Sequence, residues 1–266
     1  MYPVLLRIGS FQISTYGVFI ATGFIVAIFY LVRESKKKGH DPNLVLDLCY
    51  YILIAAIVGS RLFYIAINGD HYLAHPLDIF KIWQGGLVFY GGLIGSVLIS
   101  IWFVRKHKLN FFSFGDHIIP AVPLGHMFGR LGCFFAGCCY GREAESLPWA
   151  VTFTHLESLA PKNIPLHPTQ LYSSLSGLSI FFILLVLQRY KKFDGQVFAS
   201  YFIIYPIFRI IIERFRGDYA RKFLPLPGAP EAISTGDVVS FFIFLIGVFL
   251  WFYLRYKDAH TPTRSV

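Results

Sequence analysis

Long apolar runs, separated by short polar connections, extend through most of this 266-residue chain. A helix needs about 20 mostly apolar residues to cross a bilayer, and seven of the runs suit that purpose. The pattern therefore predicts an all-α integral membrane protein with about seven transmembrane helices. The predicted spans are residues 16–32, 44–67, 85–104, a fourth from about 116 into the stretch 125–142, and then 170–188, 196–213 and 235–254.

Basic residues fall mainly after alternate spans, and this sets the predicted orientation. Cytoplasmic connections are enriched in Lys and Arg. The amino terminus is therefore expected outside and the carboxyl terminus in the cytoplasm. More than half of the 24 basic residues lie in four tracts after spans one, three, five and seven: Arg33, Lys36, Lys37 and Lys38; Arg105, Lys106 and Lys108; Arg189, Lys191 and Lys192; Arg255, Lys257 and Arg264.

Two features interrupt the apolar pattern. Pro120 and Pro123 fall within the fourth run, where proline is expected to break the helix. Residues 140–169 are too polar to be embedded and are expected to form a small extracytoplasmic cap.

Residues 1–266 are otherwise expected to be a single membrane-embedded domain. No repeat of about 20–50 residues is evident, which disfavours an inverted-repeat transporter.

Composition agrees with a membrane protein. Hydrophobic residues make up 55% of the chain and charged residues only 15%, whereas soluble domains carry about 25% charge. The net charge of +9 suggests nucleic acid as a partner, but the basic residues lie between apolar spans and indicate topology instead. No cleaved signal peptide is expected. The four cysteines are too few and too local for a disulfide scaffold.

The stretch 125–142, GHMFGRLGCFFAGCCYGR, places Arg130 within an apolar run. An ionisable side chain at membrane depth costs about 2.5–3.5 kcal/mol on insertion scales and usually faces a bundle interior or a wet cavity. Arg130 is therefore expected to meet an anion. The alternative is a helix-packing face with one arginine that reaches the interface. Glycines that allow close approach of backbone or ligand are Gly125, Gly129, Gly132, Gly137 and Gly141.

Other arginines lie near the predicted outer ends of spans. Guanidinium binds phosphate through two hydrogen bonds and stays charged when partly dehydrated, so an anionic lipid headgroup is the expected ligand. Arg209 and Glu213 are four residues apart and are expected to pair on one helical face, which leaves Arg214 or Arg216 for a ligand. The complete set of these outer arginines is Arg61, Arg130, Arg142, Arg209, Arg214 and Arg216.

The cysteines, together with His126, His155 and His167, suggest a metal only weakly. Cys138 and Cys139 are adjacent, which is poor ligand spacing, and no C-x-x-C pair exists. No metal and no cofactor are expected. Arg130 would favour a thiolate nearby, but burial opposes it. The segment LHPTQLY (166–172) places His167 and Gln170 just before span five, with Pro168 expected in the first helical turn.

Six ordered segments resemble bacterial prolipoprotein diacylglyceryl transferases, and together they cover nearly the whole chain. The segments are STYG (14–17), GSRL (59–62), GGLVFYGGLIG (85–95), GRLGCFFAGCCYG (129–141), HPTQLY (167–172) and ERFRGD (213–218). The resemblance implies transfer of the diacylglyceryl group of phosphatidylglycerol to the lipobox cysteine of a prolipoprotein. A thioether forms and glycerol phosphate is released. The implied location is the bacterial plasma (inner) membrane, with a multi-pass chain and an active site toward the outer leaflet.

The sequence departs from the commoner family motif, G-R-x-G-N-F-x-N-x-E-x-x-G. Cys133 and Ala136 replace the two asparagines, and Cys138 replaces the glutamate. Tyr90 stands where the family usually has histidine, and Ser173 where it has an acid. The sequence is interpreted as a divergent subtype, with an inactive lipid-binding relative as the alternative.

The resemblance implies roles for particular residues. Arg130 and Arg216 are expected to hold the phosphate, and Tyr16 and Tyr90 match functional positions; these four are the predicted catalytic residues. Tyrosine, with a pKa near 10, is a poor base at neutral pH, so Tyr90 is expected to orient the headgroup or thiol. The predicted substrate-binding set is Arg130, Arg216, Arg61, Gly91, Gly92, Gly129, Gly132, Cys133, Cys138, Gly141, His167 and Gln170.

The sequence disfavours two other classes of membrane protein. A small-solute transporter needs a polar route, and the inner halves of the spans carry few charges. An intramembrane protease needs a paired catalytic set, and Asp47 and Asp116 lie near the cytoplasmic ends of their spans. The expected partners are therefore phosphatidylglycerol and prolipoprotein, with no nucleic acid and no obligate protein partner.

Overall fold

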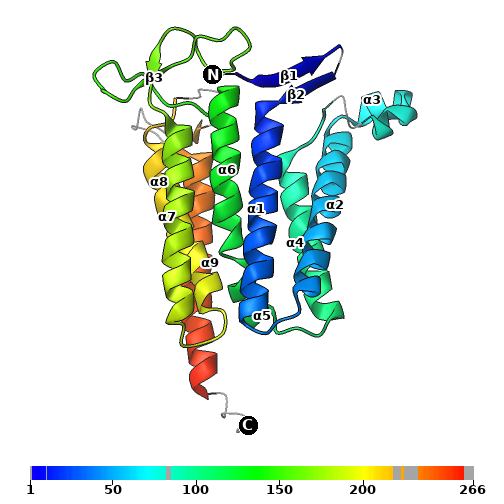
Figure 1. Ribbon diagram of the computed structural model, residues 1–266, viewed down its shortest axis with the longest axis vertical. Helices are drawn as coiled ribbons and strands as arrows, with labels where there is room; N and C mark the ends of the chain where they lie inside the picture. Colours follow the sequence, from blue (N-terminus) through cyan, green and yellow to red (C-terminus); the bar gives the residue numbers. More distant parts are fainter. Residues whose placement is uncertain (1, 10, 82–84, 218–222, 225–232, 261–266) are drawn as a thin grey trace. The chain divides into compact units, whose positions relative to one another are not determined.

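The computed structural model describes residues 2–9, 11–81, 85–217, 223–224 and 233–260. It contains two compact units, one formed by Met1–Phe29 with Gly115–Val266 and the other by Tyr30–Phe114. The helices are α1 (Thr15–Lys37), α2 (Pro42–Ile67), α3 (Gly69–Ala74), the 3₁₀ helix η1 (Pro76–Phe80), α4 (Phe89–Lys106), α5 (Phe111–Ile118), α6 (Ala121–Ala136), α7 (Thr169–Arg189), α8 (Gln196–Glu213) and α9 (Thr235–His260) (Figure 1). The strands form three antiparallel pairs: β1 (Val4–Ile8) with β2 (Phe11–Ser14), β3 (Val151–Thr152) with β4 (Pro165–Leu166), and β5 (Phe223–Leu224) with β6 (Ile233–Ser234).

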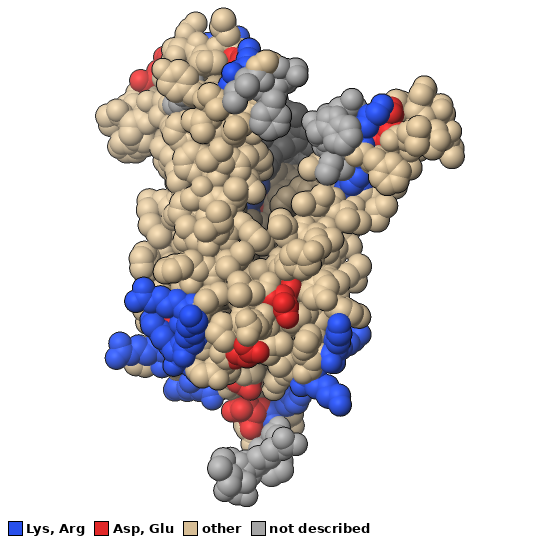
Figure 2. Space-filling model, turned by 45° about the vertical axis from the view of Figure 1, so that its right-hand side comes forward, with Lys and Arg blue, Asp and Glu red and all other residues tan. Residues whose placement is uncertain are grey.

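The predicted all-α integral membrane fold is confirmed. Within the described residues, seven helical stretches are long and apolar enough to cross a membrane, with α5 and α6 together forming one of them. Figure 2 shows a mostly tan surface, with Lys and Arg side chains gathered in its lower part and a few near its top. Basic side chains in the last turn of α1, α4, α7 and α9 also oppose the partial negative charge of each helix terminus.

Three predicted boundaries differ from the structure. The third span was predicted from residue 85, but α4 begins at Phe89 because Gly85 and Gly86 adopt positive φ angles of 90° and 75°. Pro120 separates α5 from α6, as expected, but Pro123 lies in the first turn of α6, where no intrahelical donor is lost. Pro168 precedes α7 as its N-cap residue and is not in the first turn.

Glycines form the contact between α2 and α4 in the unit Tyr30–Phe114. A Cβ atom on Gly91 would lie 2.3 Å from the carbonyl oxygen of Gly59, and one on Gly95 would lie 2.5 Å from that of Ala55. The two backbones therefore touch, as in helix pairs with small residues at the interface. This confirms that the glycines of 85–95 allow close helix packing.

Small residues also bring helices together in the larger unit. A Cβ on Gly132 of α6 would lie 3.1 Å from the carbonyl oxygen of Tyr16 in α1. Gly177 of α7 approaches the carbonyl oxygen of Pro123 in α6, at 2.9 Å from its hypothetical Cβ. An apolar cluster of buried side chains, comprising Ile119, Ile180, Leu184 and Val197, packs α7 against α8 and the α5–α6 junction.

The polar segment between α6 and α7 folds on itself. Strand β3 pairs with β4 through Val151 with Leu166 and Thr152 with Pro165. Beneath the pair, Phe153, Ala160 and Leu166 form a separate buried cluster. The predicted cap is thus an ordered structure with its own small core, and it positions the chain that enters α7.

Candidate functional site

Three predicted motif segments meet beyond the ends of α6, α7 and α8. The Gly141 amide donates to the His167 carbonyl at 3.0 Å, and the Arg142 amide donates to the Phe215 carbonyl at 2.9 Å. Gly141 also forms an antiparallel bridge with Arg216. The segment after α6 therefore lies between the HPTQLY segment and the ERFRG segment, although these are distant in sequence.

Two glycines make this junction possible. A Cβ on Gly141 would lie 2.5 Å from the His167 carbonyl oxygen and 2.7 Å from that of Phe215. A Cβ on Gly217 would lie 2.6 Å from the Arg142 amide nitrogen. Real side chains essentially never make such close contacts with backbone, so larger residues would separate the three segments. Gly141 was predicted to bind substrate, and the structure shows that it sets the spacing of the site.

Arg130 lies in the last two turns of α6 and is part-buried. Its Nε donates to Nε2 of His126, one turn earlier, at 2.8 Å. The two terminal nitrogens have no hydrogen-bond partner among the described residues. Because Nε is held by His126, the fork of the guanidinium is oriented in advance, which suits bidentate binding of an anion. His126 was not in the predicted site. Its position four residues before Arg130 on an apolar helix is the signal that could have identified it.

The three clustered cysteines come together in space. Their sulfur atoms, on Cys133, Cys138 and Cys139, all lie within 4.8 Å of one another. Helix α6 ends at Ala136, and Gly137 at φ 77° turns the chain back. The Cys138 thiol consequently approaches the Cys133 carbonyl, at 3.8 Å. Adjacent cysteines and the absence of a C-x-x-C pair do not predict this convergence, because it depends on the backbone turn at Gly137.

Helix α7 holds the cysteine loop from the other side. Thr169 Oγ1 donates to the Cys139 carbonyl, and Gln170 Nε2 donates to the Cys138 carbonyl, each at 2.8 Å. Both side chains are fully buried, and Oε1 of Gln170 has no hydrogen-bond partner among the described residues. Gln170 was a predicted site residue. Thr169 was not, although it belongs to the same motif.

Tyr16 and both motif arginines share this environment. Tyr16, in the first turn of α1, is within electrostatic range of Arg130 and the three cysteines. Arg216 and Arg130 are both within electrostatic range of Cys139. Gly129 and Gly132 lie on the α1 side of α6, against Ile20 and Tyr16 respectively. Tyr16, Arg130, Cys133, Cys138 and Arg216 are therefore brought together as predicted.

His167 lies at the edge of this cluster. Its Nδ1 is 3.3 Å from the Tyr172 hydroxyl, which accepts a hydrogen bond from the indole nitrogen of Trp149 at 2.8 Å. Burial, with a smaller contribution from Arg142, lowers the pKa of His167 below its usual value. The His167 ring also contacts the rings of Tyr172 and Phe215.

Arg61 has a different environment from the predicted one. It belongs to the unit Tyr30–Phe114, is buried, and donates to backbone carbonyls of the segment before α4. Its partners are Ile79 at 3.0 Å, Asp78 at 2.5 Å, Gly85 at 2.9 Å, Gly86 at 3.3 Å and Lys81 at 3.5 Å. Its donors are therefore directed at carbonyl groups, which makes Arg61 a residue that positions this segment.

The other predicted residues of that unit are glycines and a tyrosine. Gly91 and Gly92 are buried in the contact with α2, and their predicted substrate-binding role stays a prediction. Tyr90, in the first turn of α4, is 61% exposed and its ring meets Phe89 edge-on.

The arginines of α8 and of the segment that follows it separate into two kinds. Arg209 pairs with Glu213 on one face of α8, as predicted. Arg214 pairs with Asp237 of α9 at 3.4 Å. Arg216 is held at the junction by its backbone bridge to Gly141. Of the two arginines left open by the sequence, the structure thus puts Arg216 beside the cysteine loop.

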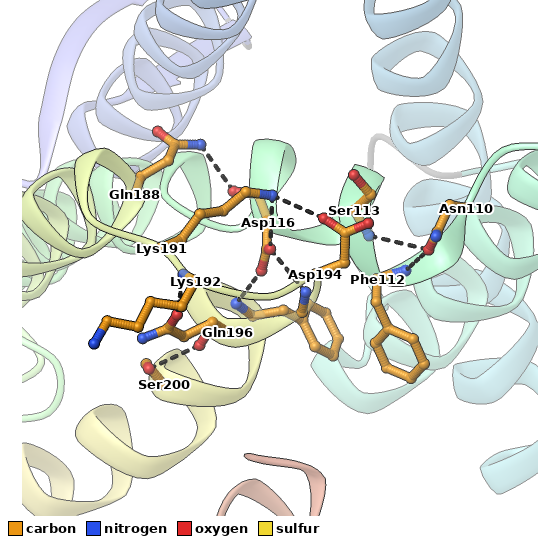
Figure 3. A network of polar contacts seen from close by, with 12 residues as sticks. Asn110, Phe112, Ser113, Asp116, Gln188, Lys191, Lys192, Asp194, Gln196 and Ser200 are labelled. Atoms are coloured by element: carbon orange, nitrogen blue, oxygen red, sulfur yellow. Dashed lines mark hydrogen bonds and ion pairs between the residues drawn. The ribbon is translucent and has the colours of Figure 1, made fainter. Parts of the chain in front are cut away.

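Asp116 forms a second polar cluster with Lys191, Gly195 and Phe198, here called the Asp116 cluster (Figure 3). Its carboxylate accepts hydrogen bonds from the amides of Gly195 and Phe198, each at 2.8 Å, and its Oδ2 lies 3.3 Å from Lys191 Nζ. A buried carboxylate at the amino-terminal end of α8 satisfies amides that the helix leaves unpaired. This use of Asp116 is structural, in agreement with its rejection as a protease residue.

Known proteins place this arrangement in a family. The family model described as prolipoprotein diacylglyceryl transferase matches residues 3–253. The chain belongs to this family. Proteins named phosphatidylglycerol–prolipoprotein diacylglyceryl transferase are similar over nearly their whole length. The Clostridium tetani protein is 35% identical over 257 residues, 97% of this chain and 99% of that protein. The Geobacter sulfurreducens protein is 36% identical over 250 residues, 92% of each chain, and the Proteus mirabilis protein is 32% identical over 281 residues, 98% of this chain and 94% of that one.

Proposed function

We propose that this chain transfers the diacylglyceryl group of phosphatidylglycerol to the lipobox cysteine thiol of prolipoproteins, with formation of a thioether and release of glycerol phosphate. The observation that carries this proposal is the family match, which extends over residues 3–253 of the 266-residue chain. Convergence of the three motif segments supports it, because it gathers two arginines at one polar site in an otherwise apolar helical protein.

Arg130 and Arg216 are the proposed phosphate ligands. The reaction displaces a phosphate ester from an sp³ carbon, so negative charge grows on the departing phosphate. Preorganised donors aimed at developing charge lower the barrier most where water is excluded. The fork of Arg130, oriented through His126, suits this task.

Supporting roles go to the neighbouring residues. Tyr16 is proposed to contact the headgroup, and Cys133 and Cys138 the incoming thiol. Gln170 and His167 shape the site from the α7 side through their contacts with the Cys138 carbonyl and Tyr172. Gly129, Gly132 and Gly141 set backbone spacing. Tyr90 is proposed as a positioning residue, and Arg61 orders the segment before α4.

The replacements in the motif define a divergent subtype in this proposal. Cys133, Ala136 and Cys138 occupy positions where the family pattern has two asparagines and a glutamate. They lie in one loop region together with Cys139, so the changes concern one part of the site. The persistence of Arg130 and Arg216 beside that region supports an active enzyme.

The proposed location is the bacterial plasma membrane, with residues 1–266 acting as one membrane-embedded domain and the site toward the outer leaflet. Basic tracts that follow α1, α4 and α7 support a cytoplasmic position for those ends. A reporter inserted near Ser158 is expected to be outside, and one inserted after Lys192 inside. The predicted fusion point after Val266, expected to be cytoplasmic, lies outside the described residues. Reversed signals at Ser158 and Lys192 would overturn this orientation.

The decisive experiment uses the purified full chain in detergent with phosphatidylglycerol and a lipobox peptide. Mass spectrometry is expected to show addition of one diacylglyceryl group to the peptide cysteine, with glycerol phosphate released in equal amount. Phosphatidylethanolamine in place of phosphatidylglycerol, and a peptide with serine for cysteine, are the controls. Binding of phosphatidylglycerol without transfer would identify an inactive lipid-binding relative.

A further inference from the structure

The three-sulfur cluster has the dimensions of a metal site. A tetrahedral zinc–thiolate centre with bonds of about 2.3 Å places its sulfurs about 3.8 Å apart. The sulfurs of Cys133, Cys138 and Cys139 lie within 4.8 Å of one another, so shifts of about 1 Å or less bring them to that spacing. The fourth cysteine, Cys49, is buried in α2 and is a natural internal control.

The loop is built to hold this spacing. Gly137 at φ 77° reverses the chain, and Cys139 itself adopts φ 60°. A left-handed conformation at a residue other than glycine is strained and is found where surrounding structure enforces it, often at functional sites. A Cβ on Gly137 would lie 2.1 Å from Ser158 Oγ, so the turn is also packed against the cap.

Buried side chains support the two adjacent cysteines. Thr169 and Gln170 hydrogen-bond the carbonyls of Cys139 and Cys138, respectively, at 2.8 Å. Metal ligands generally have such outer partners, which fix their orientation. The buried Oε1 of Gln170 has no partner among the described residues, and it provides an acceptor for a group that enters the site.

The charge balance also fits a cation with three thiolates. Three thiolates with one Zn²⁺ carry a net charge of about −1. Arg130 and Arg216 both lie within electrostatic range of Cys139. The positive charge of these two arginines exceeds the negative charge of the zinc–thiolate centre, so the two guanidinium groups can still attract phosphate. Thiolate ligands favour soft ions such as Zn²⁺.

We propose that Cys133, Cys138 and Cys139 bind one zinc ion, and that its open fourth position takes the thiol of the lipobox cysteine. Three protein ligands with one open position are the usual arrangement of catalytic zinc. This inference rests on the proposed function for the identity of the fourth ligand. The metal site itself stands on the geometry of the cysteine loop.

The chemistry balances without a change of oxidation state. A thiol that coordinates zinc is deprotonated, and its proton passes to solvent. The sulfur lone pair forms the bond to the glyceryl carbon that carries the phosphate. The carbon–oxygen bond breaks with its electron pair on the phosphate oxygen, and glycerol phosphate leaves and takes up a proton according to pH. The zinc therefore supplies the thiolate for which the sequence offers no evident base.

Metal analysis of the full chain, purified without chelator, tests the site independently of transfer. We expect about one zinc per chain in the wild type and in Cys49→Ser. Removing a direct ligand should weaken binding more than the 10–100-fold typical of an outer partner, so Cys133→Ser, Cys138→Ser and Cys139→Ser should each bind at least about 100-fold more weakly. Monodispersity in detergent shows that the variants are folded.

Cobalt tests the open position in the same protein. Co²⁺ exchanged into the wild type should give sulfur-to-metal charge-transfer absorption, absent from the three cysteine variants. Addition of a lipobox peptide should change that spectrum, whereas the peptide with serine for cysteine should not. An unchanged spectrum would overturn the proposed fourth ligand.

Two results would overturn the metal site: a wild type that binds no more zinc than the cysteine variants, and a disulfide among the three cysteines with no zinc bound after reduction. Normal transfer by protein shown to be metal-free would overturn the proposed role of zinc in the reaction. Zinc binding without transfer to peptide would leave the site intact and refute the proposed function. The two proposals thus fail separately.

Discussion

The two ends of α7 hold polar clusters of opposite kinds. This 21-residue helix separates them by about 30 Å. At its carboxyl end, both oxygens of Asp116 accept backbone amide hydrogen bonds and Lys191 balances the charge. At its amino end, the terminal nitrogens of Arg130 and Oε1 of Gln170 have no hydrogen-bond partner among the described residues. The first cluster is closed and the second is open to a ligand.

This difference distinguishes stability from function. A buried charge is tolerated when it is paired and hydrogen-bonded, and breaking such a pair is strongly destabilising. Donors and acceptors that the fold does not satisfy contribute little to stability, and they persist where a substrate or ion completes them. Substitutions at the open cluster should therefore impair transfer, and those at the Asp116 cluster should impair folding.

The largest expected effect concerns the two arginines. One preorganised donor to a developing oxyanion is worth about 2.7–4 kcal/mol, and each 1.36 kcal/mol is about tenfold in rate. Arg130→Gln and Arg216→Gln should each lower transfer from phosphatidylglycerol by at least about a hundredfold, with little change in thermal stability. Lysine at either position should restore only part of the rate, because ammonium lacks the bidentate fork.

The matched control is Arg7→Gln. Arg7 forms a 2.6 Å ion pair with Glu157, and both side chains are well exposed; such surface pairs contribute little. This variant should transfer at close to the wild-type rate. Near-normal turnover in Arg130→Gln or Arg216→Gln would refute the phosphate assignment.

The next effect should appear in stability. Asp116→Asn keeps the shape but loses the charge that faces two amides and Lys191. Hydrogen bonds to charged groups contribute about 1.5–3 kcal/mol, so the free energy of unfolding in mixed micelles should fall by about 2–3 kcal/mol. Transfer per folded molecule should be unchanged. Asp194→Asn, which removes the half-exposed second partner of Lys191, should cost less than about 1 kcal/mol. Loss of turnover in folded Asp116→Asn protein would erase the contrast between the two clusters.

The sequence predicted the helices well and the details of the site less well. Seven apolar runs specify seven spans because length and hydropathy alone decide membrane insertion. The motifs indicated that Arg130, His167 and Arg216 belong together. The sulfur convergence depends on left-handed backbone at Gly137 and Cys139 and on hydrogen bonds from α7, thirty or more residues away. The carbonyl partners of Arg61 could not be predicted, because they belong to a segment whose path the sequence does not specify.

A smaller effect should follow removal of one outer partner of the cysteine loop. Thr169→Val keeps the side-chain volume and deletes the hydrogen bond to the Cys139 carbonyl. Zinc affinity should fall by about 10–100-fold, measured by competition with a coloured chelator. Ser200→Ala removes a hydroxyl that bonds the Gln196 carbonyl in α8 and should leave zinc affinity unchanged. Equal affinities in the wild type and Thr169→Val would show that α7 does not support the loop.

The smallest expected effect is that of Tyr90→Phe, which keeps the ring and removes only the hydroxyl. A general base contributes about 10²–10⁴ in rate, so a catalytic hydroxyl would be obvious by its loss. The side chain of Tyr90 is 61% exposed, and its ring meets Phe89 edge-on. If zinc coordination produces the thiolate, no side-chain base is needed there. Transfer by Tyr90→Phe should therefore fall less than about tenfold, with the same pH profile as the wild type between pH 6 and about 9. A drop of about a hundredfold or more, with loss of the rise in rate toward high pH, would make Tyr90 the base.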